Sequence, residues 1–81
     1  MKFNIKTMKQ IGLALRAIRK ESGFTQKEVS SKVNLLPKTV SALESGSSGS
    51  TIESLMKYIA ALDCDIIIKP RWNNSKNKSG W

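Results

Sequence analysis

The sequence predicts a small all-α domain followed by one short strand, and three observations carry this prediction. Apolar residues recur every three or four positions over most of the chain, which indicates amphipathic helices. Two of the predicted helices are short and are separated by only a tight turn. Near the C-terminus, a run of isoleucines ends close to a proline, and β-branched residues favour a strand.

Length, charge and composition limit the classes of function. With 81 residues the chain fits one domain. Its net charge of +8 is typical of a domain that meets a polyanion such as nucleic acid, and a merely solvated charged surface is an equal alternative. Because there is no histidine and only one cysteine, Cys64, we expect no metal site, no cofactor and no enzyme activity. No apolar run reaches the roughly twenty residues of a membrane span, so we expect a cytoplasmic protein.

The first helix is predicted to run from about Met8 to Glu21. Its apolar residues are spaced so that they share one face of a helix, and they are Ile11, Ala14, Leu15 and Ile18. Gly23 follows, and glycine readily adopts the left-handed conformation that commonly ends a helix.

Two local patterns specify the start of the second helix. Thr25 and Glu28 have the spacing of a capping box, in which each side chain accepts a hydrogen bond from the backbone of the other residue. Phe24 and Val29 occupy the two positions of a hydrophobic staple. We expect Asn34 to end this helix, because asparagine tolerates the left-handed conformation.

The third helix is predicted to begin at Pro37, because proline suits the first position of a helix, and to end at Ser45 before Gly46. Ser50 and Glu53 offer a second capping box at the start of a fourth helix. The fourth helix has a strong apolar stripe, which consists of Ile52, Leu55, Met56, Ile59 and Leu62.

A strand is predicted over residues 64–69, around Ile66, Ile67 and Ile68. One strand alone leaves backbone groups unpaired, so we expect it to pair with its own copy across a two-fold axis. A disordered or merely packed isoleucine cluster is the alternative. Residues 1–71 then form one domain with its dimerisation strand, and residues 72–81 form a flexible polar tail that ends on Trp81.

Two short helices joined by a tight turn form a helix-turn-helix unit. Here residues 25–33 are the first helix and residues 37–45 the recognition helix. The sequence resembles the Xre/Cro family of helix-turn-helix repressors over roughly residues 8–62, most specifically in Gly-Phe-Thr-Gln at 23–26 and Leu-Glu-Ser-Gly at 43–46. This resemblance implies a lambda-repressor-like bundle that binds a palindromic site on double-stranded DNA as a homodimer.

The resemblance also implies that the start of the recognition helix faces the bases. Pro37, Lys38 and Ser41 are expected to project toward base edges, where Lys38 can donate to guanine. A plain phosphate contact is an equal alternative for Lys38. Leu36 either touches a thymine methyl group or a sugar, or simply packs against the protein.

Other positions are implied to hold the DNA backbone or the fold. Gln26 is expected to bind a phosphate at the start of its helix, with a plain surface position as the alternative. Thr39 and Ser47 are further candidates for phosphate contacts. Arg19 and Glu44 match positions that form an ion pair in the family, and we interpret them as structural.

The layout of the whole chain resembles the HipB antitoxins of HipA/HipB-type toxin–antitoxin pairs. The features that carry this resemblance are Ile66 to Ile68, the polar tail and Trp81. The resemblance implies repression of the protein's own operon and binding to a HipA-like serine/threonine kinase toxin, with Trp81 as a partner-binding anchor. Three alternatives stay open: a kinase-neutralising antitoxin whose DNA function is minor, a stand-alone Xre-type regulator without a toxin, and an incidental tryptophan at the chain end.

Overall fold

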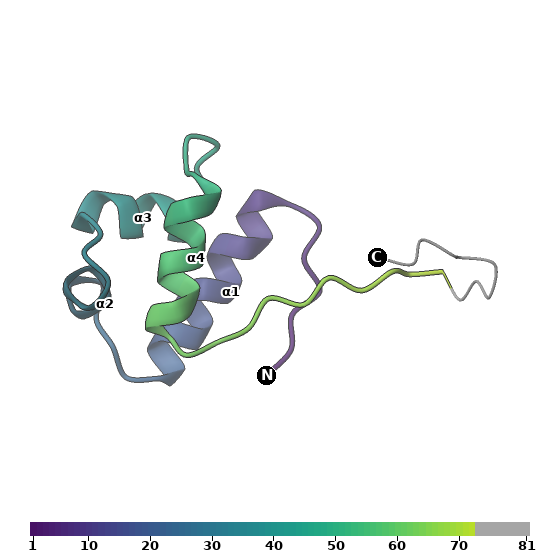
Figure 1. The fold of residues 1–81 in the computed structure, drawn as a ribbon, viewed down its shortest axis with the longest axis horizontal. Helices are drawn as coiled ribbons and strands as arrows, with labels where there is room; N and C mark the ends of the chain where they lie inside the picture. The colour runs from purple at the N-terminus through teal and green to yellow at the C-terminus, as the bar shows by residue number, and fades with distance from the viewer. Residues whose placement is uncertain (73–81) are drawn as a thin grey trace.

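The computed structural model describes residues 1–72, and this part of the chain contains four helices (Figure 1). They are α1 (Met8–Glu21), α2 (Gln26–Lys32), α3 (Pro37–Ser45) and α4 (Ile52–Ala61). The predicted all-helical bundle is therefore confirmed, with α2 and α3 in the places of the helix-turn-helix unit. Within the described residues no helix is both long enough and apolar enough to cross a bilayer.

The bounds of α1 agree with the prediction, but its start has a cap that the sequence analysis missed. Thr7 Oγ1 accepts a hydrogen bond from the backbone of Gln10 at 3.1 Å, and the Gln10 side chain accepts one from Thr7 N at 3.2 Å. This is a capping box, and the signal was present as Thr-Met-Lys-Gln at residues 7–10. After the helix, Gly23 is left-handed as predicted, with a φ of 81°.

The predicted start and end of α2 are confirmed. Thr25 Oγ1 accepts from Glu28 N at 3.1 Å, and Glu28 Oε1 accepts from Thr25 N at 2.8 Å. Phe24 packs against the core cluster that includes the fully buried Val29, as a hydrophobic staple requires. Asn34 has a φ of 57°, so it makes the left-handed turn between α2 and α3.

α3 begins without a side-chain cap, because Leu36 occupies the N-cap position and makes no capping hydrogen bond. Pro37 begins the helix as predicted. Gly46 ends α3 in the left-handed conformation, with a φ of 75°.

The start and the buried face of α4 correct two expectations. Its N-cap is Thr51 rather than Ser50, because the extended backbone of an N-cap residue lies at Thr51, whose Oγ1 accepts from Ser54 N at 3.1 Å. Ile52 and Met56 are 74% and 51% exposed, so their assignment to the inward stripe was wrong. The fully buried Tyr58, which the apolar pattern omitted, takes a central place on the inward face, and Met56 lies outside that face. Ile52 is the first residue of α4.

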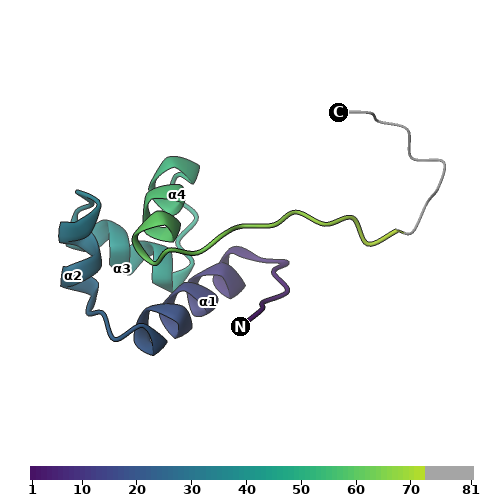
Figure 2. The same cartoon turned by 60° about the horizontal axis from the view of Figure 1, so that its bottom comes forward.

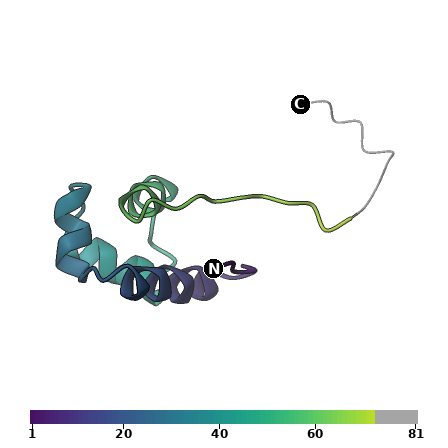
Figure 3. The ribbon, with the colours of Figure 1, turned by 90° about the horizontal axis from the view of Figure 1, so that it is seen from below.

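Every helix contributes to one core. The largest fully buried side chains come from all four helices, and they are Leu15, Val29, Val40, Leu43 and Tyr58. Figures 2 and 3 show α2 at one end of this bundle and the segment after α4 leaving at the opposite end. The core therefore fixes the position of α3 relative to the other three helices.

α1 and α3 meet backbone to backbone, and two glycines make this possible. A Cβ atom on Gly12 would lie 2.3 Å from the carbonyl oxygen of Glu44. One on Gly46 would lie 2.6 Å from the Cα atom of Lys9. Neither helix backbone can move aside without disturbing the core, so both positions exclude a side chain.

The described part of the chain contains no strand. The segment after α4 leaves the bundle as an extended chain (Figure 3). Residues 65–70 make no backbone hydrogen bond to another described residue, and Ile67 and Ile68 are 82% and 93% exposed. Pairing with a second copy is not tested by one chain, so the strand over residues 64–69 stays a prediction.

We predict that Gly12→Ala destabilises the protein, although alanine favours a helix more than glycine does. The added methyl group meets the backbone of Glu44, and overpacking of this kind costs about 1–3 kcal/mol or more. Urea denaturation followed by circular dichroism measures the change. Leu13→Ala at the next position is the control, because that side chain is 56% exposed. Equal stability of the Gly12 variant and the wild type would contradict the close contact.

Candidate nucleic-acid interface

A buried ion pair joins α1 to the end of α3. Arg19 Nε lies 2.6 Å from Glu44 Oε2, and Arg19 Nη2 donates to Glu44 Oε1 at 3.1 Å. The two side chains are only 10% and 4% exposed. A third donor of the guanidinium, Nη1, binds the backbone oxygen of Phe24 at 2.8 Å. The predicted structural pair is thus confirmed, and it also ties the loop before α2 to α1.

Two further residues bind the same carboxylate, and the sequence analysis missed both contacts. The hydroxyl of Tyr58 on α4 donates to Glu44 Oε2, and the side-chain amide of Gln26 on α2 donates to Oε1 at 3.0 Å. Glu44 therefore accepts four hydrogen bonds from three other helices. We call Arg19, Gln26, Glu44 and Tyr58 the carboxylate network.

The protonation states of this network follow from its geometry. Burial by itself raises the pKa of Glu44, but the hydrogen bonds from Arg19, Tyr58 and Gln26 outweigh it and hold the pKa below its usual value. The hydrogen bond to Glu44 raises the pKa of Arg19. Burial, together with the adjacent carboxylate, raises the pKa of Tyr58. At neutral pH the network therefore contains an ionised pair and a neutral phenol.

The outer side of α3 presents the residues that were predicted to face the bases. Leu36 is 60% exposed, and Pro37, Lys38 and Ser41 are all exposed. On the inner side, Val40 and Leu43 are buried in the core. The first turns of α3 thus expose a lysine and a hydroxyl group to solvent, while the opposite side of the helix is held in the core.

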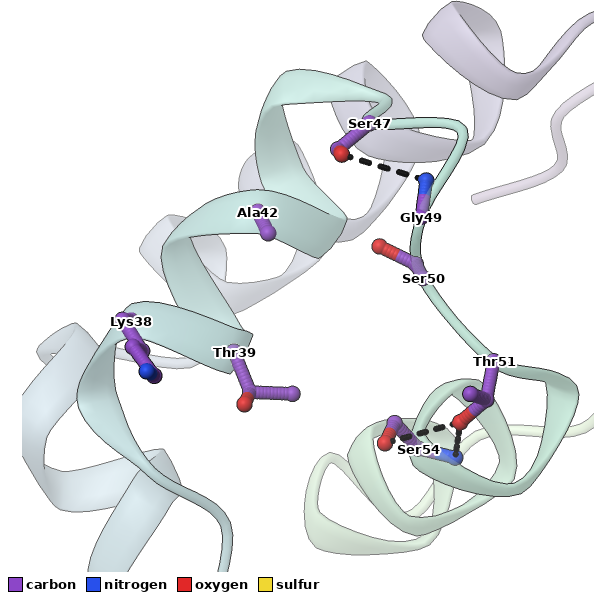
Figure 4. Close-up of a pocket in the computed structure, with 8 residues that line it drawn as sticks. All are labelled: Lys38, Thr39, Ala42, Ser47, Gly49, Ser50, Thr51 and Ser54. Carbon is purple, nitrogen blue, oxygen red and sulfur yellow. Dashed lines mark hydrogen bonds between the residues drawn. The ribbon is translucent and has the colours of Figure 1, made fainter.

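The other predicted contact residues lie beside this surface. Thr39 and Ser47 are half-buried and line a hollow of about 330 Å³ between α3, the loop after it and the start of α4 (Figure 4). Five of the eight lining residues carry a hydroxyl group, one is a cation and none is an acid, and the lining is Lys38, Thr39, Ala42, Ser47, Gly49, Ser50, Thr51 and Ser54. Inside it, Ser47 Oγ accepts from Gly49 N at 3.3 Å.

Gln26 was expected to face solvent, as a phosphate contact or a plain surface residue, and its position in the structure differs. It is half-buried, and its amide nitrogen faces Glu44 rather than solvent, although it still occupies the first position of α2. A carboxylate only accepts hydrogen bonds, so the network fixes which end of the Gln26 amide points inward. Trp81, the predicted partner-binding residue, lies outside the described residues.

The fold and the exposed start of α3 define a helix-turn-helix domain. A family model described as Helix-turn-helix matches residues 15–68. The chain therefore belongs to the helix-turn-helix family, in its Xre type, and is a DNA-binding regulator of that kind. No curated protein matches it.

Comparison with solved structures shows which known folds the chain resembles. The HipA-HipB-O2-O3 complex contains a chain that matches with a TM-score of 0.80 at 22% identity, over 85% of this chain and 97% of that chain. The HipB-O4 20mer complex matches with a TM-score of 0.79 at 22% identity, over the same shares of the two chains. A mutant of the restriction-modification controller protein C.Esp1396I matches with a TM-score of 0.66 at 29% identity, over 72% and 77%. The fold is thus HipB-like.

We predict that Glu44→Gln destabilises the protein by about 3–5 kcal/mol at pH 7, because it leaves the Arg19 charge buried without a partner. The pKa of Glu44 is lowered in the folded state, so its stabilising effect is complete above the ordinary carboxyl pKa and is lost as the pH falls through the folded value. Urea denaturation at several pH values between 7 and 3 should therefore show the gap between the variant and the wild type closing on acidification. A gap of constant size would contradict the assignment.

Proposed function

We propose that this protein is a transcriptional repressor that reads a palindromic operator as a homodimer and acts as an antitoxin. The observation that carries the DNA-reading role is the exposed start of α3, which is held from behind by the core and the carboxylate network. An element that must enter the major groove needs such a fixed orientation. Lys38 and Ser41 are the proposed base-reading residues, with Pro37 beside them and Leu36 placed to meet a thymine methyl group.

The backbone of the DNA is proposed to lie along the flanks of α3. Thr39 and Ser47 supply hydroxyl groups from the hollow, and Gln26, in the first turn of α2, supplies the second N–H of its side-chain amide. Most contacts in protein–DNA complexes go to phosphates and set the register of the protein. The net charge of +8 supports such contacts by releasing counterions from the DNA.

The homodimer is proposed to form through residues 64–69. Ile66, Ile67 and Ile68 are 47%, 82% and 93% exposed, and their backbone groups make no hydrogen bond to any other residue among 1–72. Pairing with a second copy would cover these side chains and supply hydrogen-bond partners for their backbone groups. The domain then comprises residues 1–71, and a two-fold axis places the two α3 helices on successive turns of the DNA.

The antitoxin role is proposed from the HipB-like fold together with the C-terminal residues. HipB is solved in a complex with HipA, and the match extends over 97% of the HipB chain. A HipA-like serine/threonine kinase is the proposed toxin, and Trp81, at the end of residues 72–81, is the proposed anchor in it. Large aromatic side chains commonly dominate the energy of such contacts.

A stand-alone regulator without a toxin is the second candidate. The similarity to a restriction-modification controller protein, at 29% identity, favours it. The two candidates differ in one observable: only an antitoxin forms a stable complex with a kinase encoded beside it.

We predict that Lys38→Ala and Ser41→Ala weaken binding to the operator and relax its sequence preference. A good base contact contributes about 1–3 kcal/mol of discrimination, which is roughly a tenfold or larger change in affinity. Preferred duplexes are first selected from a randomised pool and then titrated by fluorescence anisotropy. Arg16→Ala on the exposed side of α1 removes the same charge and is the control. If the Arg16 and Lys38 variants lose affinity equally, base reading by Lys38 is wrong.

We predict that deletion of residues 72–81 abolishes binding to the kinase while DNA affinity changes less than threefold. Co-expression with the neighbouring kinase, purification and native mass measurement test this expectation. Trp81→Ala in the full chain separates the aromatic anchor from the rest of the tail. Recovery of the same complex with the truncated chain would remove the tail from the proposal.

A further inference from the structure

The residues before α1 have a pattern that the helix-turn-helix unit does not use. From residue 1 to residue 6 apolar and polar side chains alternate strictly, with Phe3 and Ile5 on one side and Lys2 and Asn4 on the other. This is the pattern of a strand with one buried face. In the single chain Phe3 and Ile5 are 41% and 40% exposed, so that face is only partly covered. We call residues 1–6 the lead.

Residues 64–69 have the same length and a matching pattern. In an extended chain one side carries only apolar side chains, and the other side carries two charged residues and one isoleucine. The apolar side consists of Cys64, Ile66 and Ile68. Because Cys64 packs against the core cluster, this side continues the apolar surface of the bundle.

The backbones of both segments lack partners. Among residues 1–72, no N–H or C=O group of residues 1–5 or 65–72 is hydrogen-bonded to another described residue. Both segments lie at the same end of the bundle, away from α2 (Figures 1 and 2). A ladder between two copies of residues 64–69 would leave one open edge on each strand, and a two-stranded sheet is marginally stable by itself.

We propose that the lead adds to this open edge as an antiparallel outer strand, so that two copies of the chain form a four-stranded sheet. The inference rests on the homodimer of the proposed function. A register with Phe3 opposite Ile66 also places Ile5 opposite Cys64, so the apolar sides coincide.

Two measurements on the full-length protein test this arrangement. Hydrogen exchange is followed residue by residue by NMR, and the molecular mass in solution distinguishes a monomer from a dimer. An outer strand bonds through every second residue, so alternate amides of the lead should exchange at least tenfold more slowly than in a free chain. Phe3→Ser should remove this protection and raise the dimer dissociation constant about tenfold, because the change occurs twice in each dimer. Asn4→Ser on the polar side is the matched control and should leave both quantities within twofold.

Each other result has a definite meaning. A dimer with protected amides at residues 65–68 and a freely exchanging lead would overturn the outer strand but leave the proposed dimer intact. A monomer with neither segment protected would overturn both. A monomer in which the lead and residues 64–69 protect each other would replace the four-stranded sheet by pairing within one chain.

Discussion

The architecture depends on one buried carboxylate. Glu44 stands at the end of α3 and accepts hydrogen bonds from α1, α2 and α4 through Arg19, Gln26 and Tyr58. A charge in this position is costly unless every acceptor is used, so the four helices must keep the arrangement that satisfies it. The angle between α2 and α3, on which groove entry depends, is therefore set from inside the bundle and not by the surface that meets the DNA.

Close packing of α1 against α3 complements this constraint. Gly12 and Gly46 let the two backbones touch, and the contact brings the end of α3 within reach of Arg19. The requirement for glycine and the requirement for an ion pair thus act on the same interface. With its inner side held in this way, α3 can leave Lys38 and Ser41 in solvent, where they cost little stability and are free to bind.

Local sequence signals predicted the elements well, because caps and turns are decided by neighbouring residues. The capping box at Thr25, the left-handed Asn34 and the stop at Gly46 were all found where the sequence placed them. Errors arose where two local signals overlapped or where packing decided. Ser50 and Thr51 are both reasonable caps for α4, and only the backbone conformation distinguishes them. The family resemblance supplied the Arg19–Glu44 pair, which no local pattern contains.

By itself the sequence determined four helices and most of their ends, since each depends on residues a few positions apart, and the family resemblance added the exposed start of α3. Tertiary structure alone decided that Tyr58 and Gln26 complete the carboxylate network, that Gly12 is a contact point, and that Ile52 and Met56 stay outside the core. These features join residues from different helices. Their partners are fixed only when the helices are packed, so a linear pattern of apolar and polar residues cannot specify them.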